Sequence, residues 1–196
     1  MTRFMSLPVR PNPEALANDT LTRSGKPRMP NDRAIDVERI VREFCKLEPM
    51  FIPDLNLTGK PLLGLFSPAL NAILVNDCCI DVRQRFTIAH EIGHVQLEHR
   101  QGNASSLFGP ETLEIFGCTE EDEDLSSMDE VRAESQAKLR RVKEIRANKF
   151  ASHLLMPGGL VRQVWREERA NLEQVASALM VSKEALGYRL NSVGLS

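Results

Sequence analysis

Residues 81–102 contain the pattern that most constrains the fold, because they predict a single amphipathic helix with two histidines one turn apart. Asp81 and Gln84 have the spacing of a capping box at the start of a helix, and Gly102 stands where a helix stop belongs. Between them a broad apolar surface repeats at helical spacing, formed by Phe86, Ile88, Ala89, Ile92, Gly93, Val95 and Leu97. We therefore expect a helix that packs against a core.

His90, Glu91 and His94 give this helix the pattern H-E-x-x-H. Four residues correspond to about 400° on a helix, so His90 and His94 project from one face and can bind one Zn²⁺. Glu91 is rotated by about 100° from His90, close enough to take a proton from a water on the open metal position. The pattern predicts Zn²⁺ as cofactor and Glu91 as catalytic base. The alternative is a pair of histidines on a core-facing helix with a glutamate between them by chance.

A catalytic zinc usually has a third protein ligand. His99 is rotated about 140° from the metal face, and the metzincin spacing fails because positions 97 and 100 hold Leu97 and Arg100. Glu144 lies on a second expected helix that can face the first, and Asn148, one turn on, could hydrogen-bond a ligating histidine. The spacing alone favours Glu144 as a solvated partner of Lys143, Arg146 or Arg140, so the third ligand stays open at this point. His153 and Tyr188 are weaker candidates for the site.

The remaining pattern predicts an α+β protein. We expect a small antiparallel sheet from strands at 62–66 and 72–75. Helices are expected at 32–47, 128–156, 160–168, 171–179 and 182–190. The expected organisation is a flexible extension at 1–31, a metallopeptidase domain at 32–157 and a helical, helix-turn-helix-like subdomain at 158–196.

The stretch 103–137 breaks the helical pattern and is strongly acidic. It holds ten acidic residues, opposed only by Arg132. We expect the insert at about 103–127 to be a solvated loop; the alternative is a segment that covers the cleft or mimics an anionic partner.

Composition narrows the class of protein. The net charge of −2 gives no global sign of nucleic-acid binding, and no apolar stretch is long enough to cross a bilayer. The N-terminus does not have the apolar core of a secretory signal. The four cysteines include no CxxC spacing, which favours free thiols in a reducing cytoplasm over a cysteine zinc site.

Two spaced segments resemble the signatures of the ImmA/IrrE metallopeptidases. The first is residues 85–94, reading RFTIAHEIGH, and the second is residues 144–151, reading EIRANKFA, followed by LLMP at 154–157. The resemblance covers roughly 32–102 and 138–194. The long gap between His94 and Glu144 and the N-terminal extension depart from the family pattern.

The resemblance implies a minimal gluzincin-like core, in which a small sheet packs on two zinc-binding helices. It implies His90, His94 and Glu144 as ligands and Glu91 as base. It also implies an endopeptidase that cuts a helix-turn-helix (XRE-type) repressor or an antitoxin, in a stress, phage or mobile-element context.

A competing hypothesis is a DNA-binding or antitoxin-type regulator that keeps a weak or inactive metal site. The segment 172–191 has the pattern of a helix-turn-helix reader. From Pro157 onward, however, five cations face four acids, a balance of 5 − 4 = +1. A DNA reader usually has a more basic surface, so we expect this tail to pack or to dock substrate.

Overall fold

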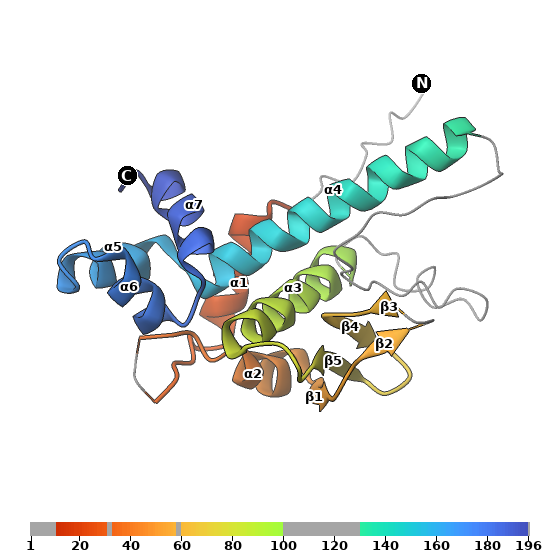
Figure 1. Ribbon diagram of the computed structural model, residues 1–196, viewed down its shortest axis with the longest axis horizontal. Helices are drawn as coiled ribbons and strands as arrows, with labels where there is room; N and C mark the ends of the chain where they lie inside the picture. Colours follow the sequence, from red (N-terminus) through yellow and green to blue (C-terminus); the bar gives the residue numbers. More distant parts are fainter. Residues whose placement is uncertain (1–10, 31–32, 58–59, 100–129, 196) are drawn as a thin grey trace, which may run out of the picture.

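The computed structural model describes residues 11–30, 33–57, 60–99 and 130–195, and has a mixed α+β fold (Figure 1). The helices are α1 (Pro13–Arg23), α2 (Val37–Arg39), the π-helix η1 (Ile40–Cys45), α3 (Asp81–His99), α4 (Glu130–Leu155), α5 (Gly158–Glu167), α6 (Leu172–Leu179) and α7 (Lys183–Val193). The strands are β1 (Glu48–Ile52), β2 (Asn56–Leu57), β3 (Lys60–Pro61), β4 (Gly64–Ser67) and β5 (Ala72–Asn76).

The main sheet has three strands in the order β1-β5-β4. The expected antiparallel pair is present, because β4 pairs with β5 from Gly64 opposite Val75 to Ser67 opposite Ala72. The prediction of a wholly antiparallel sheet is wrong: β1 runs parallel to β5, so the sheet is mixed. β1 and β5 can be parallel because the chain between them crosses back through β2, β3 and β4, which form the long connection that parallel strands require.

The sheet lies directly against α3. A Cβ atom on Gly64 of β4 would lie only 2.4 Å from Cγ2 of Thr87 and 2.8 Å from the Leu74 carbonyl oxygen. Only glycine leaves room for this approach, which places β4 beside the turn of α3 that precedes the H-E-x-x-H pattern.

Helix α3 forms as expected and is buried over most of its length, with Ile88, Ala89 and Ile92 in the core. Its start differs in detail from the expected capping box. Asp81 is the first helical residue, and the Gln84 side-chain amide donates to the Cys79 carbonyl oxygen at 2.7 Å.

Helix α4 runs alongside α3 and extends beyond it, so that its N-terminal turns project from the body of the molecule (Figure 1). The residues that follow Glu144 include a buried set: Ala147, Phe150, Ala151, Leu154 and Leu155. Residues 137–141 are exposed. The expected helix at 128–156 is thus confirmed from Glu130 to Leu155.

The N-terminal part of the chain corrects the sequence-based expectation. We expected a flexible extension at 1–31, but Pro13–Arg23 forms α1, which buries Leu16, Ala17 and Leu21 in the core. The side chain of Asn12 caps this helix by accepting from the Glu14 amide. Burial against α3 and α4 stabilises a helix whose own pattern is weak. Residues 1–10 lie outside the described residues, as do residues 100–129 with most of the acidic insert.

The helix expected at 32–47 is shorter than predicted. It begins at Val37, after Asp36, whose side chain accepts from the Arg39 amide. From Ile40 it continues as the π-helix η1 and ends at Lys46, which has a left-handed φ of 60°. The resulting turn directs the chain into β1.

The three expected C-terminal helices are present as α5, α6 and α7. The Asn171 side chain caps α6 by accepting from the backbone N–H of Gln174, and the Ser182 side chain caps α7 by accepting from the backbone N–H of Ala185. Arg189 of α7 donates to the Met156 carbonyl oxygen at 2.8 Å, which ties α7 to the end of α4.

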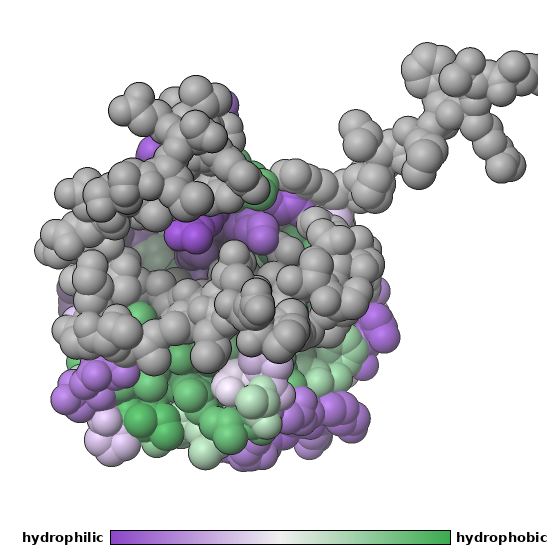
Figure 2. All heavy atoms as spheres, turned by 90° about the vertical axis from the view of Figure 1, so that its right-hand side faces the viewer, coloured by the Kyte–Doolittle hydropathy of each residue, from purple (hydrophilic) through white to green (hydrophobic). Residues whose placement is uncertain are grey.

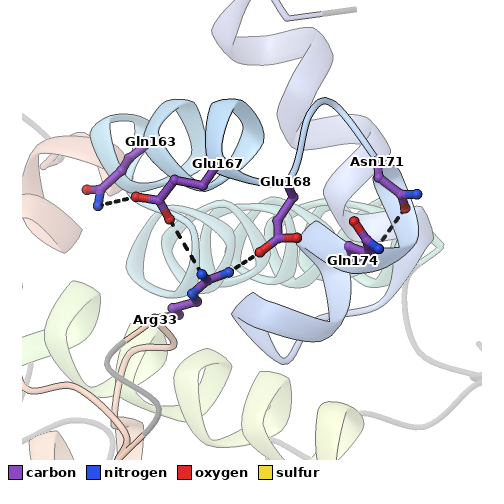
Figure 3. A network of polar contacts seen from close by, with 6 residues as sticks. All are labelled: Arg33, Gln163, Glu167, Glu168, Asn171 and Gln174. Carbon is purple, nitrogen blue, oxygen red and sulfur yellow. Dashed lines mark hydrogen bonds and ion pairs between the residues drawn. The ribbon is translucent and has the colours of Figure 1, made fainter.

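The C-terminal helices are also tied to the segment before α2. Arg33 forms ion pairs with Glu167 and Glu168 at the end of α5 (Figure 3). The buried Arg85 of α3 donates to the Ile35 carbonyl oxygen at 2.7 Å and to the Met180 carbonyl oxygen at 3.4 Å. These contacts hold 158–193 against the rest of the described chain.

Two further expectations concern thiols and membranes. Cys45, Cys78 and Cys79 are free thiols, and Cys118 lies outside the described residues. Burial raises the pKa of the Cys45 thiol to about 11, so it is protonated near neutral pH. Among the residues that the structure describes, no helix is both long and apolar enough to span a bilayer.

Candidate metal centre

Three side chains from α3 and α4 converge on one point. The Nε2 atoms of His90 and His94 lie 2.9 Å apart. Each lies 3.2 Å from a carboxylate oxygen of Glu144: His90 faces Oε2 and His94 faces Oε1. The structure thus brings together the two histidines of the pattern and the glutamate that lies fifty residues further along the chain.

Asn148 determines which nitrogen of His90 faces Glu144. Its Oδ1 lies 2.8 Å from His90 Nδ1. An amide oxygen only accepts, so His90 donates from Nδ1 and is left with a lone pair at Nε2 in its neutral form. That lone pair points to where His94 and Glu144 meet.

This arrangement suits a cation. Two ring nitrogens and a carboxylate are all acceptors in these protonation states, so without a proton or a positive ion between them they would repel one another. The three residues could hold a metal ion, since one ligand atom from each lies within 4.8 Å of the others. Two imidazoles and one carboxylate are a common ligand set for catalytic zinc.

Glu144 is ionised in this environment. Partial burial of its carboxyl group would raise the pKa, but the close contacts of the carboxylate with the His90 and His94 rings outweigh that effect and hold the pKa well below its usual range. Its side chain remains 40% exposed, so solvent reaches the centre from the α4 side.

Glu91 is the buried acid of the site, with no exposed surface. Burial raises the pKa of its carboxyl group to about 8; the neighbouring His90 and the Phe66 backbone N–H oppose this rise, and the Glu144 charge adds to it. A cation held by the three converging residues would lower the pKa again. Glu91 is therefore a desolvated acid that changes its protonation readily beside a metal position.

The distance between the two helices is set at Gly93. A Cβ atom at this position would lie 3.0 Å from Cδ1 of Phe150 and 3.3 Å from the Cα and the carbonyl oxygen of Ala147. The absence of a side chain lets α4 approach α3 closely enough for Glu144 to reach both histidines. The element that crowds Gly93 is thus α4.

Several candidate residues are not part of this centre. His153 lies on a later turn of α4, where its Nδ1 is 3.7 Å from Glu14 of α1. Tyr188 is 71% exposed on α7. The position of the His99 side chain is outside the described structure.

Two neighbours of the centre were not predicted from the sequence. The Phe86 ring is tilted against His90, with ring centroids 6.4 Å apart. Its spacing of four residues from His90 could have indicated this contact. Phe66 of β4 approaches Glu91 through its backbone N–H, and a backbone group leaves no signal in residue type.

The residues of this centre lie within a segment that matches a known protein family. Residues 51–191 match the model of a peptidase family, Peptidase M78, described as the IrrE N-terminal-like domain. The matched range contains β1 from Phe51 onward, all of α3 and α4, and most of the C-terminal helices.

Two individual proteins are similar over different extents. The radiation response metalloprotease IrrE of Deinococcus radiodurans is 47% identical over 49 residues, which is 24% of this chain and 15% of that protein. A solved Mycobacterium tuberculosis transcriptional regulator matches with a TM-score of 0.59 and 18% identity, over 91% of this chain and 46% of that one. This chain thus spans less than half of either protein, and the second likeness shows the fold alone.

Proposed function

Because the chain belongs to the Peptidase M78 family, with its IrrE N-terminal-like domain, we propose that it is a zinc-dependent endopeptidase. The convergence of His90, His94 and Glu144 is the observation that carries the proposal. In this proposal the three residues hold Zn²⁺ and Glu91 is the catalytic base. The gluzincin-like character of the core belongs to the same proposal.

The chemistry divides between the metal and the chain. Zn²⁺ supplies a Lewis acid that acidifies water and polarises a carbonyl group. Glu91 accepts the proton of the attacking water on its carboxylate, holds it away from bulk solvent, and gives it to the leaving amine. Its full burial favours the transfer, because a desolvated carboxylate returns to its neutral form easily.

Asn148 positions rather than reacts. By accepting from His90 Nδ1 it keeps the Nε2 lone pair of His90 directed at the metal position. Gly93 positions Glu144 in another way: because it has no side chain, α4 can lie close enough to α3 for Glu144 to reach the metal position.

We propose a regulatory substrate: a helix-turn-helix (XRE-type) repressor or an antitoxin, cut in the cytoplasm. The sequence resemblance to the ImmA/IrrE peptidases supports this, as does partial identity to a protein named a radiation response metalloprotease. The free thiols of Cys45, Cys78 and Cys79 fit a reducing compartment. Gene neighbourhood would name the repressor or antitoxin.

A second candidate function is a DNA-binding regulator. It is favoured by the α6–turn–α7 arrangement, which we propose to be helix-turn-helix-like, and by a fold shared with a transcriptional regulator. The tail's charge balance of +1 weighs against it. A salt-sensitive gel shift with a defined duplex would favour this second function.

The experiment that tests the proposed function uses Glu91→Gln. Zinc content and peptide cleavage are measured on wild type and variant. We expect the variant to keep its zinc and to lose cleavage by roughly a thousandfold or more, because the acid–base group is gone while the ligands remain. Undiminished cleavage by Glu91→Gln would contradict the mechanism.

A further inference from the structure

Helix α4 is strongly cationic around Glu144. Residues 137–149 contain six cations and a single acid, Glu144 itself. The cations are Lys138, Arg140, Arg141, Lys143, Arg146 and Lys149. This local excess contrasts with the net charge of −2 for the chain.

Two of these cations lie on the same side of α4 as Glu144. At about 100° per residue, Arg140 lies about 40° to one side of Glu144 on the helix surface, and Arg141 lies about 60° to the other side. Both stand on the turn of α4 that precedes Glu144. Lys138 and Lys149 are rotated by about 120° and 140° from Glu144, and so belong to the opposite face.

The side chains of Arg140 and Arg141 are exposed. Neither forms a hydrogen bond or ion pair with another residue of the described structure. Arg146 is different, because it donates to the Pro11 carbonyl oxygen at 2.7 Å. Figure 2 views the end from which α4 projects and shows hydrophilic residues on that face.

In the part of the chain that the structure describes, neither β4 nor the buried Glu91 adds an exposed charge beside the centre. Glu144 is engaged with both histidines, and Glu91 is buried. The adjacent strand β4 has the sequence Gly-Leu-Phe-Ser, without an ionisable side chain. A peptide lying between β4 and α4 would therefore meet two guanidinium groups, and among the described side chains of these two elements the one carboxylate is that of Glu144, which faces the two histidines.

We propose that Arg140 and Arg141 are specificity-determining residues that bind an Asp or Glu side chain next to the scissile bond. The substrate class is thus a protein segment with an acidic residue beside the cut. A guanidinium group matches a carboxylate with two parallel N–H donors, which fixes register as well as charge. This inference rests on the proposed peptidase function and deepens it.

The test measures peptide binding, so that it does not depend on turnover. Zinc-loaded Glu91→Gln protein is titrated with a short fluorescein-labelled peptide that has two Glu residues beside a central Leu, and with a matched peptide that has Gln at both positions. We expect the Glu peptide to bind roughly threefold to tenfold more tightly, as two exposed ion pairs allow. The preference should weaken as salt is added.

Two double variants show which residues cause the preference for the Glu peptide. Arg140→Gln with Arg141→Gln should abolish it. Lys138→Gln with Lys149→Gln removes the same charge from the opposite face of the same helix and should leave it intact. Equal loss in both variants would show general attraction to a cationic helix and would overturn the proposal, as would a preference that survives without the arginines.

A labelled DNA duplex serves as the competing ligand. Duplex binding that requires Arg140 and Arg141, with no preference for the Glu peptide, would overturn the proposal in favour of nucleic acid. The proposed function is judged separately by wild-type turnover of the two peptides. A preference for the Glu peptide without any cleavage would count against the peptidase function but support recognition of an acidic residue by Arg140 and Arg141. Cleavage of both peptides without a preference would support the peptidase function and overturn the proposed role of the two arginines.

Discussion

The two halves of α4, divided at Glu144, belong to one helix but have opposite environments. The half that follows Glu144 is a core helix, with Phe150 and Leu154 fully buried. In the half that precedes it, residues 137–141 are exposed, and Leu139 is 44% exposed. The position of Glu144 is therefore fixed by the half that follows it, which packs against α3 and α1, whereas the exposed residues 137–141 can change without moving the centre.

The largest expected effect comes from removing the core of that packing. Phe150→Ala deletes a fully buried ring in contact distance of Gly93 and should lower the free energy of unfolding by about 3–5 kcal/mol. Leu139→Ala on the projecting half should change it by less than about 0.5 kcal/mol. Urea unfolding of both variants measures the difference, and similar losses would remove the distinction between the halves.

The next effect concerns the contact between the helices. Gly93→Val places side-chain atoms where Phe150 and Ala147 already lie, and overpacking of this kind costs about 1–3 kcal/mol. Because α4 must move away, zinc affinity should fall as well, as measured by chelator competition. Gly187→Val is the control, since no atom lies within 4 Å of a Cβ at that position. Unchanged zinc affinity in Gly93→Val would show that helix spacing does not set the centre.

A smaller effect is expected from the hydrogen bond between the core half and α3. Asn148→Ala removes the acceptor of His90 Nδ1 and should weaken zinc binding or cleavage by about 10- to 100-fold, without a comparable loss of stability. Asn148→Asp keeps an acceptor oxygen and should retain most of the affinity. If Ala and Asp behave alike, the hydrogen bond does not orient the ring.

The fold was predictable where a pattern is local. The period of apolar residues predicted α3 and α4, and the side chains of Asn171 and Ser182 marked the starts of α6 and α7. The two short apolar runs at 62–66 and 72–75 predicted the β4–β5 pair. In each case a few neighbouring residues determine the structure through caps, turns and periodicity.

Long-range packing was not predictable in the same way. Helix α1 has few apolar residues and follows a proline-rich start, so its burial depends on α3 and α4 rather than on its own pattern. The parallel pairing of β1 with β5 joins strands separated by β2, β3 and β4, and no local signal records it.

The candidate site also has one part that a local pattern predicts and one part that depends on long-range packing. Helical spacing alone places His90 and His94 on one face, and the structure agrees. Spacing left Glu144 open between a ligand and a solvated partner, and only the family resemblance favoured the ligand. The structure places Glu144 at both histidines; its binding of a metal is the proposal.

The most direct test of that proposal is zinc content by elemental analysis, on wild type and on Glu144→Ala. We predict one zinc per chain in wild type and a sharp loss in the variant, with Arg141→Ala on the projecting half as a control that keeps its zinc. Zinc held equally well by Glu144→Ala would contradict the three-residue centre, and a wild type that binds no zinc after reconstitution would contradict the zinc-peptidase function.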